Sequence, residues 1–230
     1  MARLVDRAYL GWSSAAGRFP ADRRHVTGTP LRATITALRD ESPLPPTPDR
    51  RAHLLVTGGS RDGGFLAAQV PALAEGIART RSLEVWHQTD AWQCPRLADA
   101  YAAAGVPATV VSELADIAAA YRWADLAVTR GGAGTLSELL VAGLPALVVP
   151  LADAAENHQR ENARVFAGLT GGRWVTEQHW ERDELTAWIV ATLTDSSSWR
   201  AIAERSRGAA PPDATTAIVG DCELLMRNRW

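Results

Sequence analysis

The sequence predicts an α/β protein in which a parallel sheet is covered by helices on both faces. From His53 onward, short apolar runs alternate with segments of helical periodicity, which is typical of parallel strands joined by crossover helices. Two of the strand-to-helix turns are rich in glycine, at residues 58–64 and 131–134. Such turns meet at the carboxyl edge of a parallel sheet, where ligands bind in folds of this kind.

The central unit of the chain reads strand, glycine loop, helix, strand. The apolar run at 125–128 precedes the loop, and residues 139–142 follow it at helical spacing until Gly143, which is placed to end the helix. A second apolar run lies at 146–149. Free backbone N–H groups and the positive end of the helix dipole converge at such a loop, so a phosphate or diphosphate is its natural ligand.

The remaining elements continue the alternation. Further strands are expected at 53–57, 83–87, 108–111 and 173–175. Further helices are expected at 65–79, 98–104, 117–123, 156–166, 185–193, 196–205 and 215–226.

The first 52 residues lack this regularity. Glycines and prolines interrupt residues 1–32, which do not resemble the start of a domain. Residues 33–52 contain the proline-rich stretch 43–48 and are expected to form a linker. The arginines of the first segment favour a solvated basic face over a membrane-surface patch. They are Arg3, Arg7, Arg18, Arg23, Arg24 and Arg32.

Composition excludes several classes of function. The 47% hydrophobic content is enough for a packed core, and a net charge of −2 gives no general attraction to nucleic acid. Cys94 and Cys222 lie too far apart in sequence for a zinc motif or a disulfide framework, so no metal is predicted. There is no run of about 18 uncharged apolar residues and no signal-peptide core. A soluble cytoplasmic protein, peripheral to a membrane at most, is expected.

The glycine loop at 131–138 allows three interpretations. Thr135 and Glu138 have the spacing of a capping box, in which the glutamate only holds the helix end, and the glycines could serve only a tight turn. The segment 132–137 also approaches the G-x-G-x-x-G motif of dehydrogenases, with Asp153 near the position of a ribose-binding acid. Because Ser137 replaces the third glycine, a nicotinamide enzyme is the weaker interpretation. In the third interpretation, the loop binds the diphosphate of a nucleotide ligand.

Several short motifs occur in the order and spacing of one known family. They are Gly58-Gly59-Ser60, Trp86-His87-Gln88, Tyr121-Arg122-Trp123-Ala124-Asp125, Arg130-x-Gly132-Ala133-x-Thr135-x-x-Glu138, Gly143-Leu144-Pro145-Ala146 and His158-Gln159-x-x-Asn162-Ala163. Together they resemble the C-terminal, donor-binding half of the MurG family, the peptidoglycan N-acetylglucosaminyltransferases of GT-B fold. The segment 28–32 is similar to that family's Gly-Asn-Pro-x-Arg, which closes its N-terminal domain, although Thr29 replaces the asparagine.

The resemblance implies a Rossmann-like domain over 53–230 that binds UDP-GlcNAc without a cofactor, preceded by a remnant of the acceptor domain at 1–32. The implied contacts are Arg32 and Ser60 near the diphosphate; Ala133, Gly134 and Thr135, followed by Leu136 and Ser137, at the phosphate-binding helix; Glu138 on the ribose; Leu114 near the uracil; and Gln159, with His158 beside it, on the GlcNAc hydroxyls. The loop that carries Leu114 is about a residue shorter than the family pattern, and Arg61-Asp62 replaces a usual Gln-Gly.

The family's reaction transfers GlcNAc, with inversion, to a lipid-linked muramyl-pentapeptide. Its N-terminal glycine-rich loop, which carries a candidate general base, has no counterpart before Gly28. The chain is therefore expected to bind the donor and to transfer negligibly alone, as a truncated product or as one half of a split enzyme whose acceptor domain is separate. No catalytic residue is assigned, and contact with the inner face of the membrane is left open. A non-catalytic nucleotide-sugar module or pseudoenzyme is the competing class.

Overall fold

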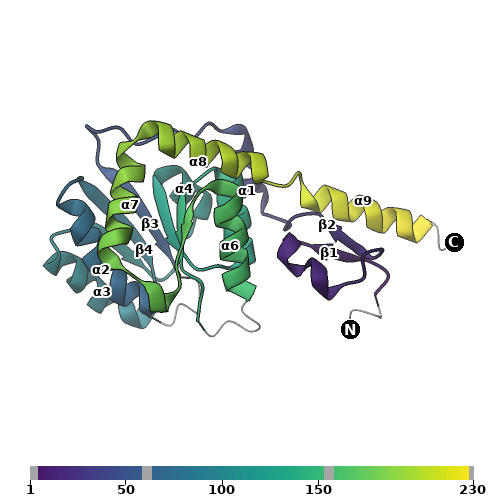
Figure 1. The fold of residues 1–230 in the computed structure, drawn as a ribbon, viewed down its shortest axis with the longest axis horizontal. Coiled ribbons are helices and arrows are strands. Elements are labelled where there is room, and N and C mark those ends of the chain that lie inside the picture. The colour runs from purple at the N-terminus through teal and green to yellow at the C-terminus, as the bar shows by residue number, and fades with distance from the viewer. Residues whose placement is uncertain (1–4, 59–63, 153–157, 228–230) are drawn as a thin grey trace.

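A parallel sheet of six strands forms the centre of the molecule in the computed structural model, which describes residues 5–58, 64–152 and 158–227 (Figure 1). In chain order the strands are β3 (Ala52–Thr57), β4 (Leu83–Gln88), β5 (Ala108–Val111), β6 (Leu126–Thr129), β7 (Ala146–Val148) and β8 (Arg173–Trp174). Their order across the sheet is β5-β4-β3-β6-β7-β8. Every neighbouring pair is parallel, so the predicted α/β fold with a parallel sheet is confirmed.

Helices cover both faces of this sheet. One layer contains α2 (Phe65–Ala78), α3 (Cys94–Ala103) and α7 (Arg182–Thr194), and the other contains α4 (Ile117–Trp123), α5 (Ala133–Ala142) and α6 (His158–Thr170). Successive strand residues point to opposite faces. Leu54 and Val56 of β3 therefore join the core beneath the first layer, whereas Leu55 joins the core beneath the second.

The helix after the second glycine turn, α5, is anchored by its apolar side. Leu136 and Leu139 are completely buried in the second core, and burying a leucine contributes about 2 kcal/mol. The helix ends at Gly143, whose φ of +67° lies in the left-handed region that favours glycine. The predicted end of this helix is therefore confirmed.

The stretch 33–52, expected from its prolines to be a linker, begins with two short helical segments. These are α1 (Ala33–Thr36) and the 3₁₀ helix η2 (Ala37–Asp40). Ile35 and Leu38 are buried in the second core, so residues 33–40 are packed onto the domain. Residues 41–46, at the start of the proline-rich part, have no regular secondary structure.

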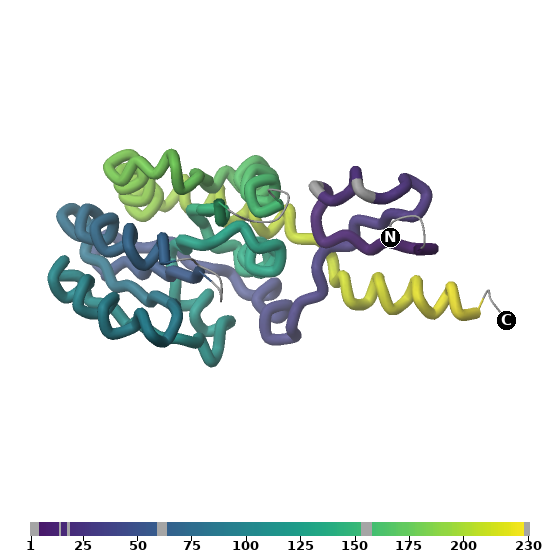
Figure 2. Tube along the Cα trace, turned by 90° about the horizontal axis from the view of Figure 1, so that it is seen from below, coloured from purple at the N-terminus to yellow at the C-terminus, as the bar shows by residue number. Residues whose placement is uncertain are grey.

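A small lobe projects from one side of the main body (Figures 1 and 2). It contains two short parallel strands, β1 (Ala8–Leu10) and β2 (Arg24–Val26), with the 3₁₀ helix η1 (Ser13–Arg18) between them. The last helix, α9 (Ala214–Arg227), leaves the main body and lies beside these strands. The Tyr9 hydroxyl donates to Asp221 Oδ2 over 2.8 Å, which links β1 near the N-terminus to α9 near the C-terminus.

Several helix boundaries differ from those expected. Helix α3 begins at Cys94 and is preceded by the 3₁₀ turn η4 (Ala91–Gln93). Between α6 and α7 lies another 3₁₀ turn, η6 (Glu177–His179). Helix α8 (Ser196–Ala209) is capped by Asp195, which accepts from the Ser197 N–H.

Within the described ranges, no helix has the length and apolar character needed to cross a bilayer.

Candidate functional site

The candidate site lies where the strand order reverses at the middle of the sheet. Strands β3 and β6 are neighbours, and the chain leaves them in opposite directions, through α2 to β4 and through α5 to β7. In open parallel sheets, ligands bind in the crevice beyond the carboxyl ends of such strands. A cavity of about 410 Å³ opens here, a size suited to a small molecule. Its lining residues are Arg32, Thr57, Gly58, Gln88, Glu113, Leu114, Ile117, Tyr121, Thr129, Arg130, Gly132, Thr135, Glu138 and Gln159.

The amino end of α5 borders this cavity. Gly132 is the N-cap, and the Leu136 N–H makes the helix's first backbone bond, to the Gly132 carbonyl over 3.0 Å. The N–H groups of residues 133–135 precede that bond and therefore have no partner within the helix. A side chain added at Gly134 would meet no atom within 4 Å, so the first turn is open on that side. This arrangement suits an anion such as a phosphate.

Glu138 does not form the capping box that its spacing with Thr135 allows. Such a box would need Thr135 at the N-cap, but Thr135 is the third residue of the helix and Gly132 is the cap. The capping interpretation is therefore wrong for this pair. The Glu138 carboxylate, one further turn along the helix, lines the cavity instead.

Two side chains hold that carboxylate. The Tyr121 hydroxyl donates to Glu138 Oε2 over 2.7 Å, and Arg32 Nη2 lies 3.6 Å from Oε1. Tyr121 is buried, and burial together with the negative charge of Glu138 raises its pKa well above the ordinary value. Tyr121 therefore stays protonated and donates. The Arg32 side chain is 65% exposed and remains open to a ligand.

The glycine turn before α5 is fixed by the start of α6. Gln159 Oε1 accepts from the N–H of Gly131 over 3.1 Å and from that of Leu151 over 3.0 Å. Asn162 Nδ2 donates to the Gly131 carbonyl over 3.2 Å. The oxygen of Gln159 thus holds two loops together, which leaves its amide nitrogen as the donor available to sugar hydroxyls.

Arg130, the cation nearest the turn, is buried and engaged. Its Nη1 donates to the Val149 carbonyl over 3.2 Å and to Glu177 Oε1 over 2.7 Å, and its guanidinium lies 5.7 Å from the centre of the Phe65 ring. These contacts tie the ends of β6 and β7 to η6. Arg130 therefore supports the rim of the cavity.

The cavity brings together part of the predicted set of binding residues. Arg32, Leu114, Thr135, Glu138 and Gln159 line it, and Ala133 and Gly134 form the adjacent first turn of α5. Leu136 and Ser137 are buried on another side of the helix, and the exposed His158 is not among the lining residues. Ser60 lies outside the described residues, as does Asp153 of the dehydrogenase interpretation.

Comparison with protein families decides the relationship of this fold. The model of the glycosyltransferase family 28 C-terminal domain matches residues 53–216. The chain belongs to this family. The match begins in β3 and reaches into α9, so it contains the six-stranded sheet. It also contains each residue named above as lining the cavity except Arg32.

Individual relatives of this glycosyltransferase family 28 domain agree. A UDP-N-acetylglucosamine–N-acetylmuramyl-(pentapeptide) pyrophosphoryl-undecaprenol N-acetylglucosamine transferase of Nitratidesulfovibrio vulgaris is 36% identical over 98% of this chain and 62% of its own length. The enzyme of the same name from Pseudomonas paraeruginosa is 37% identical over 91% of this chain and 58% of its own length. The crystal structure of Acinetobacter baumannii MurG superposes with a TM-score of 0.76 at 25% identity, covering 95% of this chain and 60% of that one. The predicted resemblance to the C-terminal half of MurG is confirmed, and the chain spans about 60% of the length of these relatives.

Sequence reasoning missed several cavity residues of this family 28 domain. Thr57 and Thr129 end the two central strands and share a 2.9 Å hydrogen bond between their hydroxyls. Tyr121 and Gln88 lay within the quoted motifs but received no role. The position of Thr57 and Thr129 at strand ends was a usable signal. Nothing in the spacing indicates that Tyr121 meets Glu138, because the two lie on different helices.

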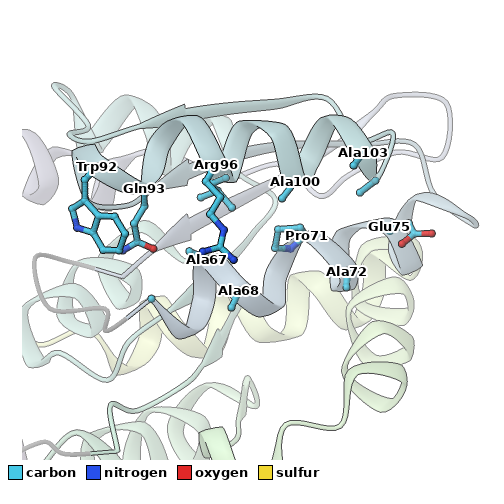
Figure 3. A pocket seen from close by; sticks show the side chains of 13 residues that line it. Ala67, Ala68, Pro71, Ala72, Glu75, Trp92, Gln93, Arg96, Ala100 and Ala103 are labelled. Carbon is cyan, nitrogen blue, oxygen red and sulfur yellow. The ribbon is translucent and has the colours of Figure 1, made fainter.

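A larger groove lies elsewhere on the domain, between α2 and α3 (Figure 3). Its volume is about 550 Å³, and among the described residues it shares no lining residue with the cavity at the strand ends. Six of its 13 lining residues are alanines, and Arg96 reaches from α3 toward α2 across it. Its carboxylate, Glu75, and its amide, Gln93, lie at opposite ends of the groove, so the two groups do not converge on one ligand (Figure 3).

Proposed function

We propose that this chain provides the nucleotide-sugar side of a UDP-GlcNAc-dependent N-acetylglucosaminyltransferase of peptidoglycan synthesis. The observation that carries the proposal is the cavity at the strand-order reversal, with the amino end of α5 on one side and the Glu138 carboxylate beside it. The family match and the printed names of the relatives support UDP-GlcNAc as the donor.

The proposed contacts follow the order of groups along the nucleotide sugar. The N–H groups of residues 133–135 and the exposed Arg32 bind the diphosphate, since both offer positive charge at one place. Glu138 accepts from the ribose hydroxyls, and the apolar Leu114 packs against the base. Gln159 donates its amide N–H groups to the sugar.

The proposed acceptor is a lipid-linked muramyl-pentapeptide, which is the acceptor in the names of the relatives. A water-soluble donor and a lipid acceptor would meet at the inner surface of the cell membrane, which is the proposed place of action. Because the chain spans 62% of the length of the Nitratidesulfovibrio relative, the rest of that protein is the proposed source of acceptor contacts.

Ligand selectivity tests this proposal. We expect UDP and UDP-GlcNAc to raise the midpoint of thermal unfolding of the purified chain, because a ligand that binds only the native state stabilises it by about 2.7 kcal/mol at 100 times its Kd. NAD at the same concentrations should leave the midpoint unchanged. Protection by NAD without protection by UDP would replace the nucleotide-sugar proposal with the dehydrogenase interpretation.

A further inference from the structure

The two oxygens of the Glu138 carboxylate have different surroundings. Oε2 accepts from the hydroxyl of Tyr121, which reaches across from α4 to α5. Oε1 lies on the side of Arg32, whose guanidinium is mostly exposed. One oxygen is thus held by a buried phenol, and the other is left beside the open part of the cavity.

An unsupported glutamate side chain would be a poor partner for a sugar diol. Its rotatable bonds give the carboxylate many orientations, and a ligand that fixes one of them loses affinity through the lost rotamer freedom. A hydrogen bond to a charged acceptor is strong enough to restrict that freedom before the ligand arrives. Burial and the neighbouring carboxylate raise the pKa of Tyr121, so its hydroxyl keeps the proton that this bond requires.

We propose that Tyr121 is a positioning residue that holds Glu138 Oε2, aims Oε1 at the ribose 2′,3′-diol, and so sets the preference of the site for ribose over 2′-deoxyribose. The inference rests on the proposed function, because it takes Glu138 to be the ribose contact. Tyr121 acts entirely through Glu138. A nucleotide without the 2′-hydroxyl cannot complete the prearranged carboxylate contact, and discrimination of this kind depends on the carboxylate being held in place.

The test is the affinity of Tyr121→Phe for UDP and for 2′-deoxy-UDP, measured by calorimetry at neutral pH. We expect the wild-type chain to prefer UDP. The variant should bind UDP about 10- to 100-fold more weakly, the range for a lost hydrogen bond to a charged group, but 2′-deoxy-UDP almost as well as the wild type does. The ratio of the two affinities should therefore fall toward one.

The chain offers a matched control in Tyr101→Phe. Tyr101 is also a buried tyrosine, but it lies in α3, in the helix layer on the other face of the sheet. Its hydroxyl shares a 2.7 Å hydrogen bond with Nδ1 of His87 in β4. It lies outside the cavity lining. Removing its hydroxyl should lower the unfolding midpoint without changing the ratio of affinities for UDP and 2′-deoxy-UDP.

A second variant pair tests whether Tyr121 acts through Glu138. If it does, adding Tyr121→Phe to Glu138→Ala, which leaves the Tyr121 hydroxyl no acceptor at position 138, should weaken UDP binding no further than Glu138→Ala alone. In Tyr121→Phe alone, the charged Glu138 carboxylate loses its hydrogen bond from the phenol, which could impair folding. The double variant has no carboxylate at position 138, so it can be measured even if the single variant folds poorly. Additive losses, or equal weakening of UDP and 2′-deoxy-UDP by Tyr121→Phe, would overturn the inference while leaving the proposed function intact. Failure of the wild-type chain to bind UDP at all would overturn both.

Discussion

His87 shows how burial changes the protonation of a titratable residue. It is fully buried in β4, and its Nδ1 shares a 2.7 Å hydrogen bond with the Tyr101 hydroxyl. Its Nε2 has no hydrogen-bond partner in the part of the chain that the structure describes. Burial lowers the pKa of His87 to about 3, so the ring is neutral at physiological pH. Because it also lies outside the cavity lining, His87 has a structural role in this domain.

The depressed pKa of His87 predicts a stability that depends on pH. The native protein resists protonating this ring until about pH 3, whereas the unfolded chain takes up the proton near its ordinary value of 6.5. The contribution of neutral His87 to the free energy of unfolding is therefore fully present above about pH 6.5 and is lost as the pH falls toward 3, by up to about 1.4 kcal/mol per pH unit. In urea titrations between pH 7 and about 4.5, His87→Asn, whose amide can still bond to Tyr101, should lose less stability than the wild type. Parallel pH profiles for the two proteins would show that His87 does not titrate as stated.

At the level of elements, the turn between β6 and α5 depends on close backbone approach. A Cβ at Gly131 would lie 2.4 Å from the carbonyl oxygen of Gln159, whereas one at Gly134 would meet nothing within 4 Å. Gly131→Ala should therefore destabilise the fold by about 1–3 kcal/mol, as overpacking does. Gly134→Ala, inside the helix, should be neutral or stabilising by up to about 1 kcal/mol. Chemical denaturation of both variants measures the difference, and equal stabilities would contradict the close approach of α6 to this turn.

The same helix shows how far its sequence could predict the site. The strand, the glycine turn and the end at Gly143 follow from local composition, and all three occur as expected. The binding stretch 133–138 was predicted as contiguous, but a helix turns about 100° per residue and distributes neighbours around its axis. Thr135 and Glu138, three residues apart, share the cavity side, while Leu136 and Ser137 between them are buried. Applying the helical period to the whole motif would have separated the two groups.

Elements stabilised by distant partners were the ones that local patterns missed. Strands β1 and β2 have three residues each and exist by pairing with one another across a segment interrupted by glycine and proline. Residues 33–40 are helical because Ile35 and Leu38 find places in the domain core. The contact between Tyr121 and Glu138 is likewise a product of the packing of α4 on α5. Local sequence patterns do not encode such contacts between residues that are distant in the sequence.

At the scale of the whole molecule, the projecting lobe is joined to the candidate site. The indole N–H of Trp12, within the lobe segment, donates to the Ala133 carbonyl over 3.0 Å and lies 3.1 Å from Ser137 Oγ. Ser137 Oγ is in turn 3.1 Å from the hydroxyl of Thr29. The buried face of α5 is therefore pinned to residues 12–29, on the side away from the cavity. Ser137, which the sequence predicts as a substrate contact, forms part of this attachment.

The extent of the chain leads to the last prediction, which concerns catalysis. These 230 residues match 62% of the length of the Nitratidesulfovibrio relative, and the rest of that protein has no counterpart in them. Among the described residues, two acidic groups line the cavity: Glu138, which is held by Tyr121, and Glu113. A general base must lie within hydrogen-bond reach of the acceptor hydroxyl and contributes roughly 10²- to 10⁴-fold to the rate.

We therefore expect the purified 230-residue chain to bind UDP-GlcNAc but to transfer GlcNAc to a lipid-linked muramyl-pentapeptide at least about 100-fold more slowly than a full-length relative, because we propose that the acceptor contacts and the general base come from the part of that relative outside the match. Adding the N-terminal part of the Nitratidesulfovibrio enzyme, in trans or as a fusion, should restore transfer, measured with radiolabelled donor. The control is the same mixture with Glu138→Gln, which should bind donor weakly and stay slow. Rapid turnover by the chain alone would contradict this prediction, and its loss in Glu113→Gln would then identify Glu113 as the base.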